Sequence, residues 1–222
     1  NGARDVYGVA EVPRDRPVVR LELDAVRDTL GPDGPIAAQL PRYEDRASQR
    51  DMAASIARLY NGGGIGLFEA GTGVGKSLGY LVPALRWAAA NGERTIVSTN
   101  TINLQEQLVG KDLPLLAAAL GDQPVRFALL KGWRNYVCLQ RLEQAGAQGT
   151  SLFEQGVAAE IDGLRAWAAR TTDGSLADLP SPPSAEAWDE VAAEADLCGR
   201  LKCPHFEGCL VFAARGRAAE VD

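Results

Sequence analysis

The sequence contains no long apolar run. No stretch approaches the roughly 20 consecutive apolar residues that a membrane-spanning helix needs. The first ten residues, NGARDVYGVA, also lack the apolar centre of a secretory signal. The sequence therefore predicts neither a membrane segment nor a membrane partner. The chain starts at Asn1 rather than Met and ends on AEVD, so we expect it to be part of a longer protein.

The chain also has no excess of positive charge. Its 23 Lys and Arg residues are outnumbered by 29 Asp and Glu residues, which gives a net charge of −6 at pH 7. This balance excludes a generally basic nucleic-acid-binding surface but is compatible with a local basic patch. With 46% hydrophobic and 23% charged residues, the composition is that of an ordinary globular protein. The 222 residues suffice for one large domain, or for one domain with an insertion.

Apolar runs and helical periodicity alternate in the first part of the chain. Short apolar runs predict buried strands at 65–70, 94–99 and 125–132. Periodic apolar residues and a closing Gly predict helices at 48–60, 78–92 and 102–120. Because strands and helices alternate, the predicted fold class is α/β, with a parallel sheet flanked by helices and joined by right-handed crossovers.

The segments on either side of this part differ from it in residue composition and pattern. The first 42 residues are punctuated by Pro and Arg and form a lead-in of uncertain structure. Residues 139–196 are Ala-rich with polar breaks and show helical patterns only, which predicts a mostly helical insertion. The predicted organisation is a lead-in at 1–42, the first part of the α/β domain at 43–137, the insertion at 138–209 and a return towards the first domain at 210–222.

Residues 70–77, AGTGVGKS, match the phosphate-binding P-loop pattern with Ala in place of the first Gly. Glycines let successive backbone N–H groups converge on phosphate oxygens, and the helix that follows directs the positive end of its dipole at the same anions. A Gly-rich turn without function is the plainer alternative, but the position between an apolar run and a helix favours nucleotide binding. The predicted cofactor-binding residues here are Ala70, Gly71, Thr72, Gly73, Val74, Gly75, Lys76 and Ser77.

Two of these residues are the catalytic candidates. Lys76 is predicted to reach the β- and γ-phosphates, and Ser77 to bind Mg²⁺. A hydrolase also needs an acidic residue, for Mg²⁺ and water, at the end of another strand. No apolar run ending in paired acids follows Lys76, so we expect that acid to lie beyond the present sequence.

Cysteine is scarce and unevenly placed. Three of the four cysteines fall in LCGRLKCPHFEGC at 197–209, and Cys138 lies far upstream. The polar, turn-rich setting argues against core cysteines, and disulfides are disfavoured because P-loop hydrolases are normally cytosolic. Metal binding is therefore favoured, and the spacing leaves zinc and an iron–sulfur cluster both open. The only histidine, His205, is interpreted as a neighbour of the site. The candidate ligands are Cys138, Cys198, Cys203 and Cys209.

Three further stretches carry a family resemblance. YEDRASQ at 43–49 resembles the adenine-reading Q-motif region of superfamily 2 helicases. STNTINLQEQL at 98–108 is similar to a DNA-facing motif of DinG-like helicases. LKGWRNYVC at 130–138 is similar to the segment that leads to the first cluster cysteine in the same helicases. With the P-loop and the cysteine-rich stretch in the same order, residues 43–222 resemble the N-terminal part of a DinG-like, XPD-related iron–sulfur DNA helicase.

This resemblance implies a RecA-like motor domain whose mostly helical insertion holds a 4Fe–4S cluster on the four cysteines. The parent would be a monomeric, ATP-dependent 5′-to-3′ DNA helicase of the bacterial cytoplasm that acts in repair and replication. Its cofactors would be ATP, Mg²⁺ and the cluster, and its partner single-stranded DNA or duplex DNA with a single-stranded overhang. By the same resemblance, Arg46 and Gln49 would contact adenine, and the DNA-facing residues would be Thr99, Thr101, Asn103, Lys131 and Arg134.

Two other functions compete with this interpretation. One is a different P-loop NTPase or a kinase with a zinc-binding insertion, and the other is an ATP-responsive nucleic-acid-binding module. The stretch STNTINLQEQL favours the helicase, because a kinase has no use for it at a strand-to-helix turn. Trp133 departs from the family pattern, where a small polar residue is expected.

Overall fold

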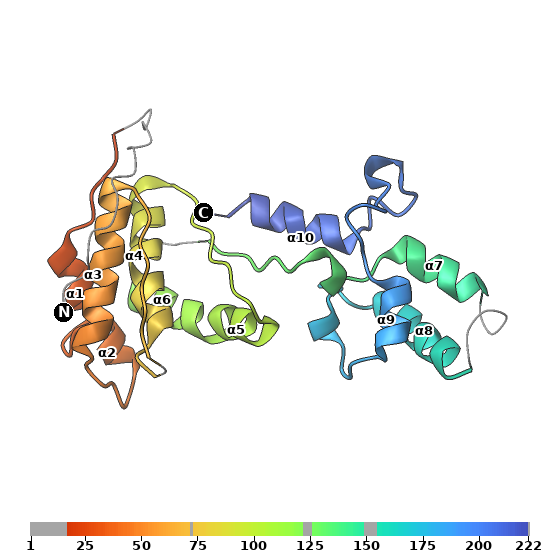
Figure 1. The fold of residues 1–222 in the computed structure, drawn as a ribbon, viewed down its shortest axis with the longest axis horizontal. Helices are drawn as coiled ribbons and strands as arrows, with labels where there is room; N and C mark the ends of the chain where they lie inside the picture. The colour runs from red at the N-terminus through yellow and green to blue at the C-terminus, as the bar shows by residue number, and fades with distance from the viewer. Residues whose placement is uncertain (1–16, 72, 122–125, 149–154, 222) are drawn as a thin grey trace. The chain divides into compact units, whose positions relative to one another are not determined.

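The computed structural model describes residues 17–71, 73–121, 126–148 and 155–221. These residues form two compact units, the first ending at Phe127 and the second running from Ala128 to Val221 (Figure 1). In the described part of the chain, no helix has the length and apolar character needed to cross a membrane. The first unit contains α1 (Leu23–Thr29), α2 (Pro35–Gln39), α3 (Ala47–Gly62), α4 (Lys76–Asn91), α5 (Ile102–Gln107), the π-helical turn η1 (Leu108–Asp112) and α6 (Leu113–Ala119).

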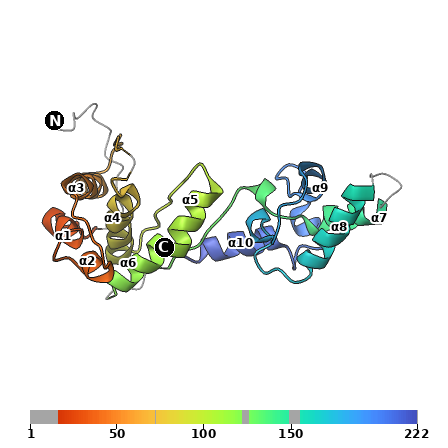
Figure 2. The same ribbon diagram turned by 90° about the horizontal axis from the view of Figure 1, so that it is seen from below.

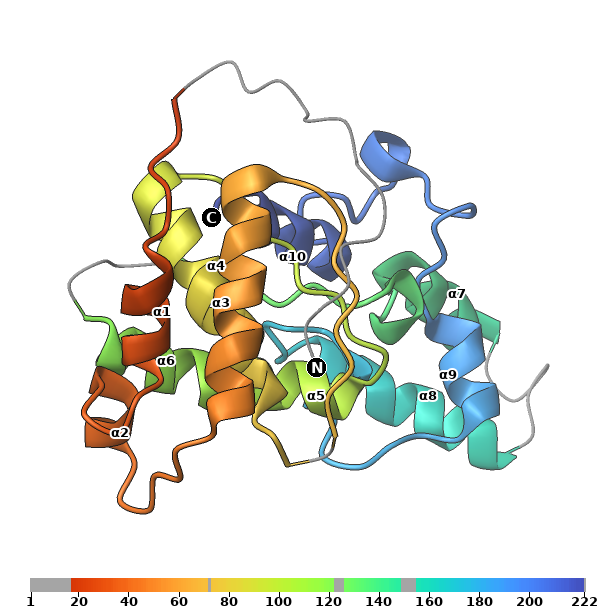
Figure 3. The same cartoon turned by 60° about the vertical axis from the view of Figure 1, so that its left-hand side comes forward.

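The core of the first unit lies between α3 and α4, which run side by side, with α1 packed against α3 (Figures 2 and 3). Small residues of α3, such as Ala53 and Ala57, are fully buried and let α4 approach closely. Trp87 of α4 is 2% exposed, and its ring stacks on Tyr60 of α3 with centroids 5.4 Å apart. Such an aromatic pair contributes about 0.5–1.5 kcal/mol beyond the area that it buries. The helices predicted at 48–60 and 78–92 are thus confirmed as α3 and α4.

The predicted parallel sheet, and with it the RecA-like α/β fold class, is wrong for the residues that the structure describes. Residues 65–70 and 94–99 are extended but form no ladder, and Figure 1 draws them as coil. The described part of the third run, 126–132, likewise contains no strand. Several apolar side chains of these runs face solvent, with Ile65 84%, Leu67 99% and Ile96 84% exposed. An apolar run indicates a preference for burial, but a strand also needs a neighbour for its backbone N–H and C=O groups.

The second unit is mostly helical, as predicted for the insertion. Its described elements are η2 (Trp133–Asn135), α7 (Leu139–Gln148), α8 (Gln155–Ala168), η4 (Leu176–Asp178), α9 (Ala185–Val191), η5 (Arg200–Lys202) and α10 (Leu210–Ala219). The helices α7, α8 and α9 pack together around Leu142, Ile161 and Val191. The predicted helical character of 139–196 is therefore confirmed where the structure describes these residues.

Two isolated antiparallel bridges tie the second unit together at residues 136–138. Tyr136 pairs with Ser175, and Val137 pairs with Ala192. Beyond them, the N–H of Cys138 donates to the carbonyl of Val191 at 2.8 Å, so the chain entering α7 is held on both sides. The predicted insertion, 138–209, lies wholly within this unit, together with α10. The exact domain boundaries given above stay predictions.

Candidate nucleotide-binding loop and cysteine pocket

The phosphate loop joins the extended segment after α3 to the start of α4. Gly73 and Gly75 have φ angles of +80° and +78°, in the left-handed region that favours glycine. Gly75 is the N-cap of α4, a helix of 16 residues, so the loop leads directly into a helix N-terminus. Gly71 and Gly73 are exposed and Val74 is half-buried, while Thr72 lies outside the described residues. The described part of the loop thus combines two left-handed glycines with a helix N-terminus, two features that phosphate-binding loops use.

The two catalytic candidates are the first residues of α4. The ammonium of Lys76 donates to the carbonyls of Ala70 (2.9 Å) and Gly71 (2.8 Å), which places its charge over the loop. Ser77 is half-buried and hydrogen-bonds the Tyr80 hydroxyl one turn along the helix. Burial raises the pKa of Tyr80, and this hydrogen bond opposes the rise. Both candidates therefore lie in the first turn of α4, directly after the loop.

The structure brings both predicted adenine-contacting residues to the loop, since a Cβ on Gly75 would also lie 3.6 Å from Nη1 of Arg46. Gln49 of α3 is 2% exposed, and its Nε2 donates to the carbonyl of Gly75 at 2.7 Å. A Cβ on Gly75 would lie 2.1 Å from that Nε2, so the contact depends on glycine. Arg46, the N-cap residue of α3, is ion-paired with Glu44. The sequence analysis did not identify Glu44 as the ion-pair partner of Arg46, although the two residues are only two positions apart.

Three predicted DNA-facing residues lie around the start of α5. The Thr101 hydroxyl accepts a hydrogen bond from the N–H of Leu104 (3.3 Å) and so caps the helix. The Thr99 hydroxyl donates to the carbonyl of Thr101 at 3.3 Å. Thr101 and Asn103 are exposed, and Thr99 is half-buried. Thr101 therefore has a local structural role besides any contact with a ligand.

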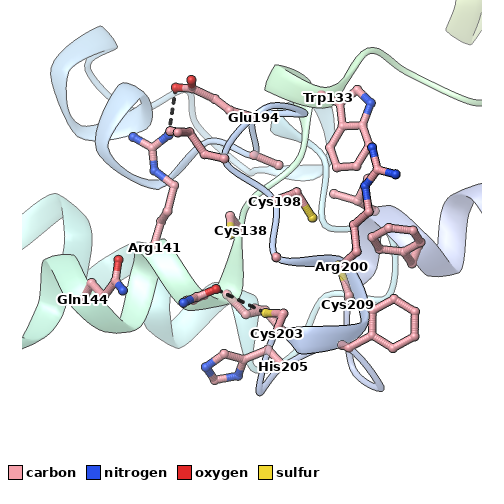
Figure 4. Close-up of a pocket in the computed structure, with 18 of the residues that line it drawn as sticks. Trp133, Cys138, Arg141, Gln144, Glu194, Cys198, Arg200, Cys203, His205 and Cys209 are labelled. Carbon is pink, nitrogen blue, oxygen red and sulfur yellow. Dashed lines mark hydrogen bonds and ion pairs between the residues drawn. The ribbon is translucent and has the colours of Figure 1, made fainter.

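All four cysteines line one pocket of about 420 Å³ in the second unit (Figure 4). Each thiol is free and half-buried. Burial raises the pKa of the Cys209 thiol, hydrogen bonds from backbone N–H groups lower it, and the nearby Cys198 and Cys138 thiols raise it again. Cys138 precedes α7, Cys209 precedes α10, and the other two flank η5. The structure thus gathers the predicted ligands from separate segments around one space.

The thiols share the pocket without being arranged as metal ligands. Cys203 donates through Sγ to Oε1 of Gln140 at 3.3 Å instead of facing another thiol (Figure 4). Among the described residues, no three His, Cys, Asp or Glu side chains are close enough together to hold a metal ion. Four thiols are nevertheless a donor set that suits zinc or an iron–sulfur cluster. The donor chemistry fits such a group, although the placed side chains do not form its coordination sphere.

The only histidine lies at the edge of the pocket and has a partner of its own. His205 Nε2 is 2.7 Å from Oε2 of Glu143, on α7. This pairing agrees with the interpretation of His205 as a neighbour of the cysteines. Glu143 and the pocket residue Gln140 were missed by sequence reasoning, because their side chains reach the site only through the orientation of α7.

The two basic residues predicted to contact DNA are both engaged within the second unit. Lys131 is only 6% exposed. Arg134 is ion-paired with Asp189 (2.6 Å) and with Glu194 (3.1 Å). Arg141 joins the same cluster through Glu194 at 2.8 Å, and this pair and its hydrogen bonds hold the pKa of Glu194 below its usual value (Figure 4).

Trp133, which departs from the family pattern, packs within the second unit and lines the cysteine pocket. Its ring meets Phe212 edge-on, with centroids 6.0 Å apart. The guanidinium of Arg215 lies 4.4 Å from the ring centroid, within the range of a cation–π contact. These contacts agree with Trp133 being a packing residue.

Comparison with known proteins gives a consistent set of relatives. The chain is 37% identical over 196 residues to the ATP-dependent DNA helicase YoaA of Escherichia coli, a match that covers 88% of this chain and 30% of the relative. It is 37% identical over 193 residues to the ATP-dependent helicase DinG of Mycobacterium tuberculosis, a match that covers 80% of this chain and 29% of the relative. The 3′-5′ exonuclease DinG of Bacillus subtilis is 32% identical to this chain over 179 residues, a match that covers 80% of this chain and 19% of the relative. The chain thus spans less than a third of the length of these curated relatives, and no protein-family model matches it.

Proposed function

Because the chain belongs to the DinG-like family of ATP-dependent DNA helicases, we propose that it is the ATP-binding part of a helicase that moves 5′ to 3′ along single-stranded DNA. The protein would open duplexes that carry a single-stranded overhang, as a monomer, in DNA repair and replication. The observation that carries this proposal is the P-loop at the start of α4, in a chain whose relatives are named ATP-dependent DNA helicases.

The phosphate loop supports the nucleotide chemistry directly. Its backbone N–H groups and the N-terminus of α4 supply hydrogen bonds and positive potential to the phosphates. Lys76 would leave the Ala70 and Gly71 carbonyls and offset negative charge on the β- and γ-phosphates, and the Ser77 hydroxyl would be a ligand of Mg²⁺. Gln49 and Arg46 lie on the α3 side of the loop and would contact the adenine edge. For Gln49, this contact requires its amide to leave the carbonyl of Gly75.

We further propose that Cys138, Cys198, Cys203 and Cys209 hold a 4Fe–4S cluster. Four free thiols lining one pocket support this assignment, because thiolates are the ligands of such clusters. When bound, the cluster would act as a structural cross-link. Ligation requires each thiol to lose its proton and Cys203 to leave Gln140.

DNA contacts are proposed for the start of α5 and the rim of the cysteine pocket. Thr99, Thr101 and Asn103 present hydroxyl and amide groups, which suit the phosphate and sugar backbone. The Arg134 side chain is 57% exposed, so it can give up its ion pairs with Asp189 and Glu194 and contact a DNA phosphate instead. Lys131 is buried, so a direct DNA contact would require its surroundings to open.

The full-length protein provides the test. We expect ATP hydrolysis that is stimulated by single-stranded DNA, and unwinding of a duplex with a 5′ overhang but not of one with a 3′ overhang. After anaerobic purification, iron and sulfide should be present at four atoms of each per chain, by the definition of the cluster. A protein that hydrolyses ATP without unwinding any DNA would contradict the helicase assignment. A colourless protein with one zinc ion would contradict the cluster and favour the zinc-containing alternative.

A further inference from the structure

A buried ammonium group is anchored in the loop before η4. The side chain of Lys131 is 5% exposed, and its Nζ donates to Ser175 Oγ at 2.8 Å and lies 3.9 Å from Oδ2 of Asp173. Ser175 is fully buried, and its hydroxyl donates to Asp173. The backbone N–H of Lys131 donates to the hydroxyl of Tyr136 at 3.1 Å. A buried charge is tolerated only when it is paired and hydrogen-bonded, and this arrangement meets both conditions.

The same loop holds the backbone that leads into Cys138. Ser175 forms its antiparallel bridge with Tyr136, two residues before the cysteine. The N–H of Val137 donates to the carbonyl of Gly174 at 3.0 Å. The loop around Ser175 therefore helps to fix the position of the backbone at Cys138.

The loop also touches the residue that follows Cys209. Gly174 has φ +71°, and a Cβ there would lie 2.4 Å from Cδ1 of Leu210. Leu210 is the first residue of α10 and directly follows the cysteine. Because glycine allows this close approach, one loop packs against the chain next to both Cys138 and Cys209. These two cysteines also pack against the same cluster of buried residues around Tyr136.

We infer that the network of Lys131, Ser175 and Asp173 is a positioning element that sets the separation of Cys138 and Cys209 for metal binding. This inference rests on the proposed metal centre. Lys131 acts through the loop and the neighbouring backbone and does not touch the metal, so it is a positioning residue. Its charge is directed inward to Asp173, which separates this role from that of a residue that contacts DNA phosphate.

The test uses the full chain in its metal-free form, loaded with Co²⁺ alone as the probe. The d–d absorption of Co²⁺ reports the number and the angles of its thiolate ligands. We expect Lys131→Met to weaken Co²⁺ binding roughly 10- to 100-fold and to shift these bands, the size of effect seen when a residue that orients metal ligands is lost. Lys111→Met makes the same chemical change at an exposed position of the first unit and should leave both unchanged. Far-ultraviolet circular dichroism should show the same helix content in every variant.

Two further variants reach the same readout by other routes. Gly174→Ala leaves the polar network chemically intact but forces Leu210 away, so it should shift the Co²⁺ bands as Lys131→Met does. Ser175→Ala removes the central hydroxyl and should weaken binding less, which keeps the test available if Lys131→Met does not fold. In the full-length protein, the salt dependence of DNA binding by Lys131→Met distinguishes the two roles of Lys131: loss of a phosphate contact would reduce its slope by about one, and loss of a positioning residue would not.

The outcomes separate this inference from the proposed metal centre. If the wild type binds Co²⁺ through thiolates and Lys131→Met and Ser175→Ala give the same affinity and spectrum, the positioning role is wrong. If the wild type itself shows no thiolate-bound Co²⁺, the metal centre fails, and the inference fails with it.

Discussion

The phosphate loop takes its residues from eight consecutive positions, whereas the cysteine pocket takes its thiols from positions between 138 and 209. In the loop, two left-handed glycines and the start of α4 shape the backbone, and Gln49 of α3 adds one distant contact. In the pocket, the positions of the thiols depend on α7, α10 and two isolated bridges. A site of the first kind is specified locally, and a site of the second kind exists only when the surrounding unit is folded.

The largest expected effect is on the cysteine pocket. Cys203→Ser replaces one of the four candidate ligands by a hydroxyl, which is a far poorer ligand for iron. We expect the purified full-length protein to lose its iron and its unwinding activity while its affinity for ATP is unchanged. Iron assays, a strand-separation assay and titration with a fluorescent ATP analogue measure the three quantities. Intact unwinding in this variant would contradict a structural role for the cluster.

Lys76→Met should affect the two sites in the opposite way. Removing the ammonium that faces the phosphates should lower the rate of ATP hydrolysis by about 10²- to 10³-fold, the effect of losing one electrostatic contact in an active site. The iron content should remain that of the wild type. Lys111→Met is the matched control and should hydrolyse ATP normally. A parallel loss of iron would show that the sites are coupled.

Gly75→Ala should have a smaller effect, on folding. The φ of +78° costs a residue with a Cβ about 1–2 kcal/mol, and that Cβ would meet Gln49 as well. We expect the urea midpoint of the first unit to fall accordingly. Gly71→Ala is the control, since a Cβ there meets nothing within 4 Å and the residue has no positive φ. Equal stability of both variants with the wild type would mean that the loop readjusts at no cost.

The smallest effect concerns the pH dependence of the second unit. Glu194 has its pKa lowered chiefly by its hydrogen bond to Arg141. A carboxyl whose folded-state pKa is depressed adds stability that is present above its ordinary value of about 4.3 and is lost as the pH falls through the lower folded-state value. Glu194→Gln should therefore lower the urea midpoint slightly at pH 7, and the difference should disappear once the pH falls below the folded-state pKa of Glu194. A difference that persists in acid would have another cause.

The parts of the molecule that are local in sequence could be predicted from it. The P-loop residues Gly73, Gly75 and Lys76 could be predicted from local backbone chemistry, although Gln49 of α3 also contacts the Gly75 carbonyl, and the helices α3 and α4 could be predicted from apolar spacing. The strands could not be predicted in this way. Ile65 and Ile96 have the β-branched, apolar character of buried strands, yet they are exposed, because a sheet depends on pairing that composition does not encode.

Side-chain partners were the least predictable feature of the candidate site. Lys131 precedes Cys138 in a basic stretch, and folding brings its ammonium to Ser175, 44 residues further on. Arg134 likewise finds its partners 55 and 60 residues away, at Asp189 and Glu194. Such pairs follow from tertiary packing around the loop before η4 and the end of α9, which spacing alone does not indicate.

The long stretch of chain between the outer two thiols has a consequence for folding. A centre held by Cys138 and Cys209 would close a loop of about 70 residues. By reducing the conformational entropy of the unfolded chain, such a cross-link would stabilise the folded unit by about 4 kcal/mol. That is comparable to the whole stability of many small domains. If the proposed centre forms, the second unit without its metal would therefore be more prone to unfolding and proteolysis than the metal-bound unit.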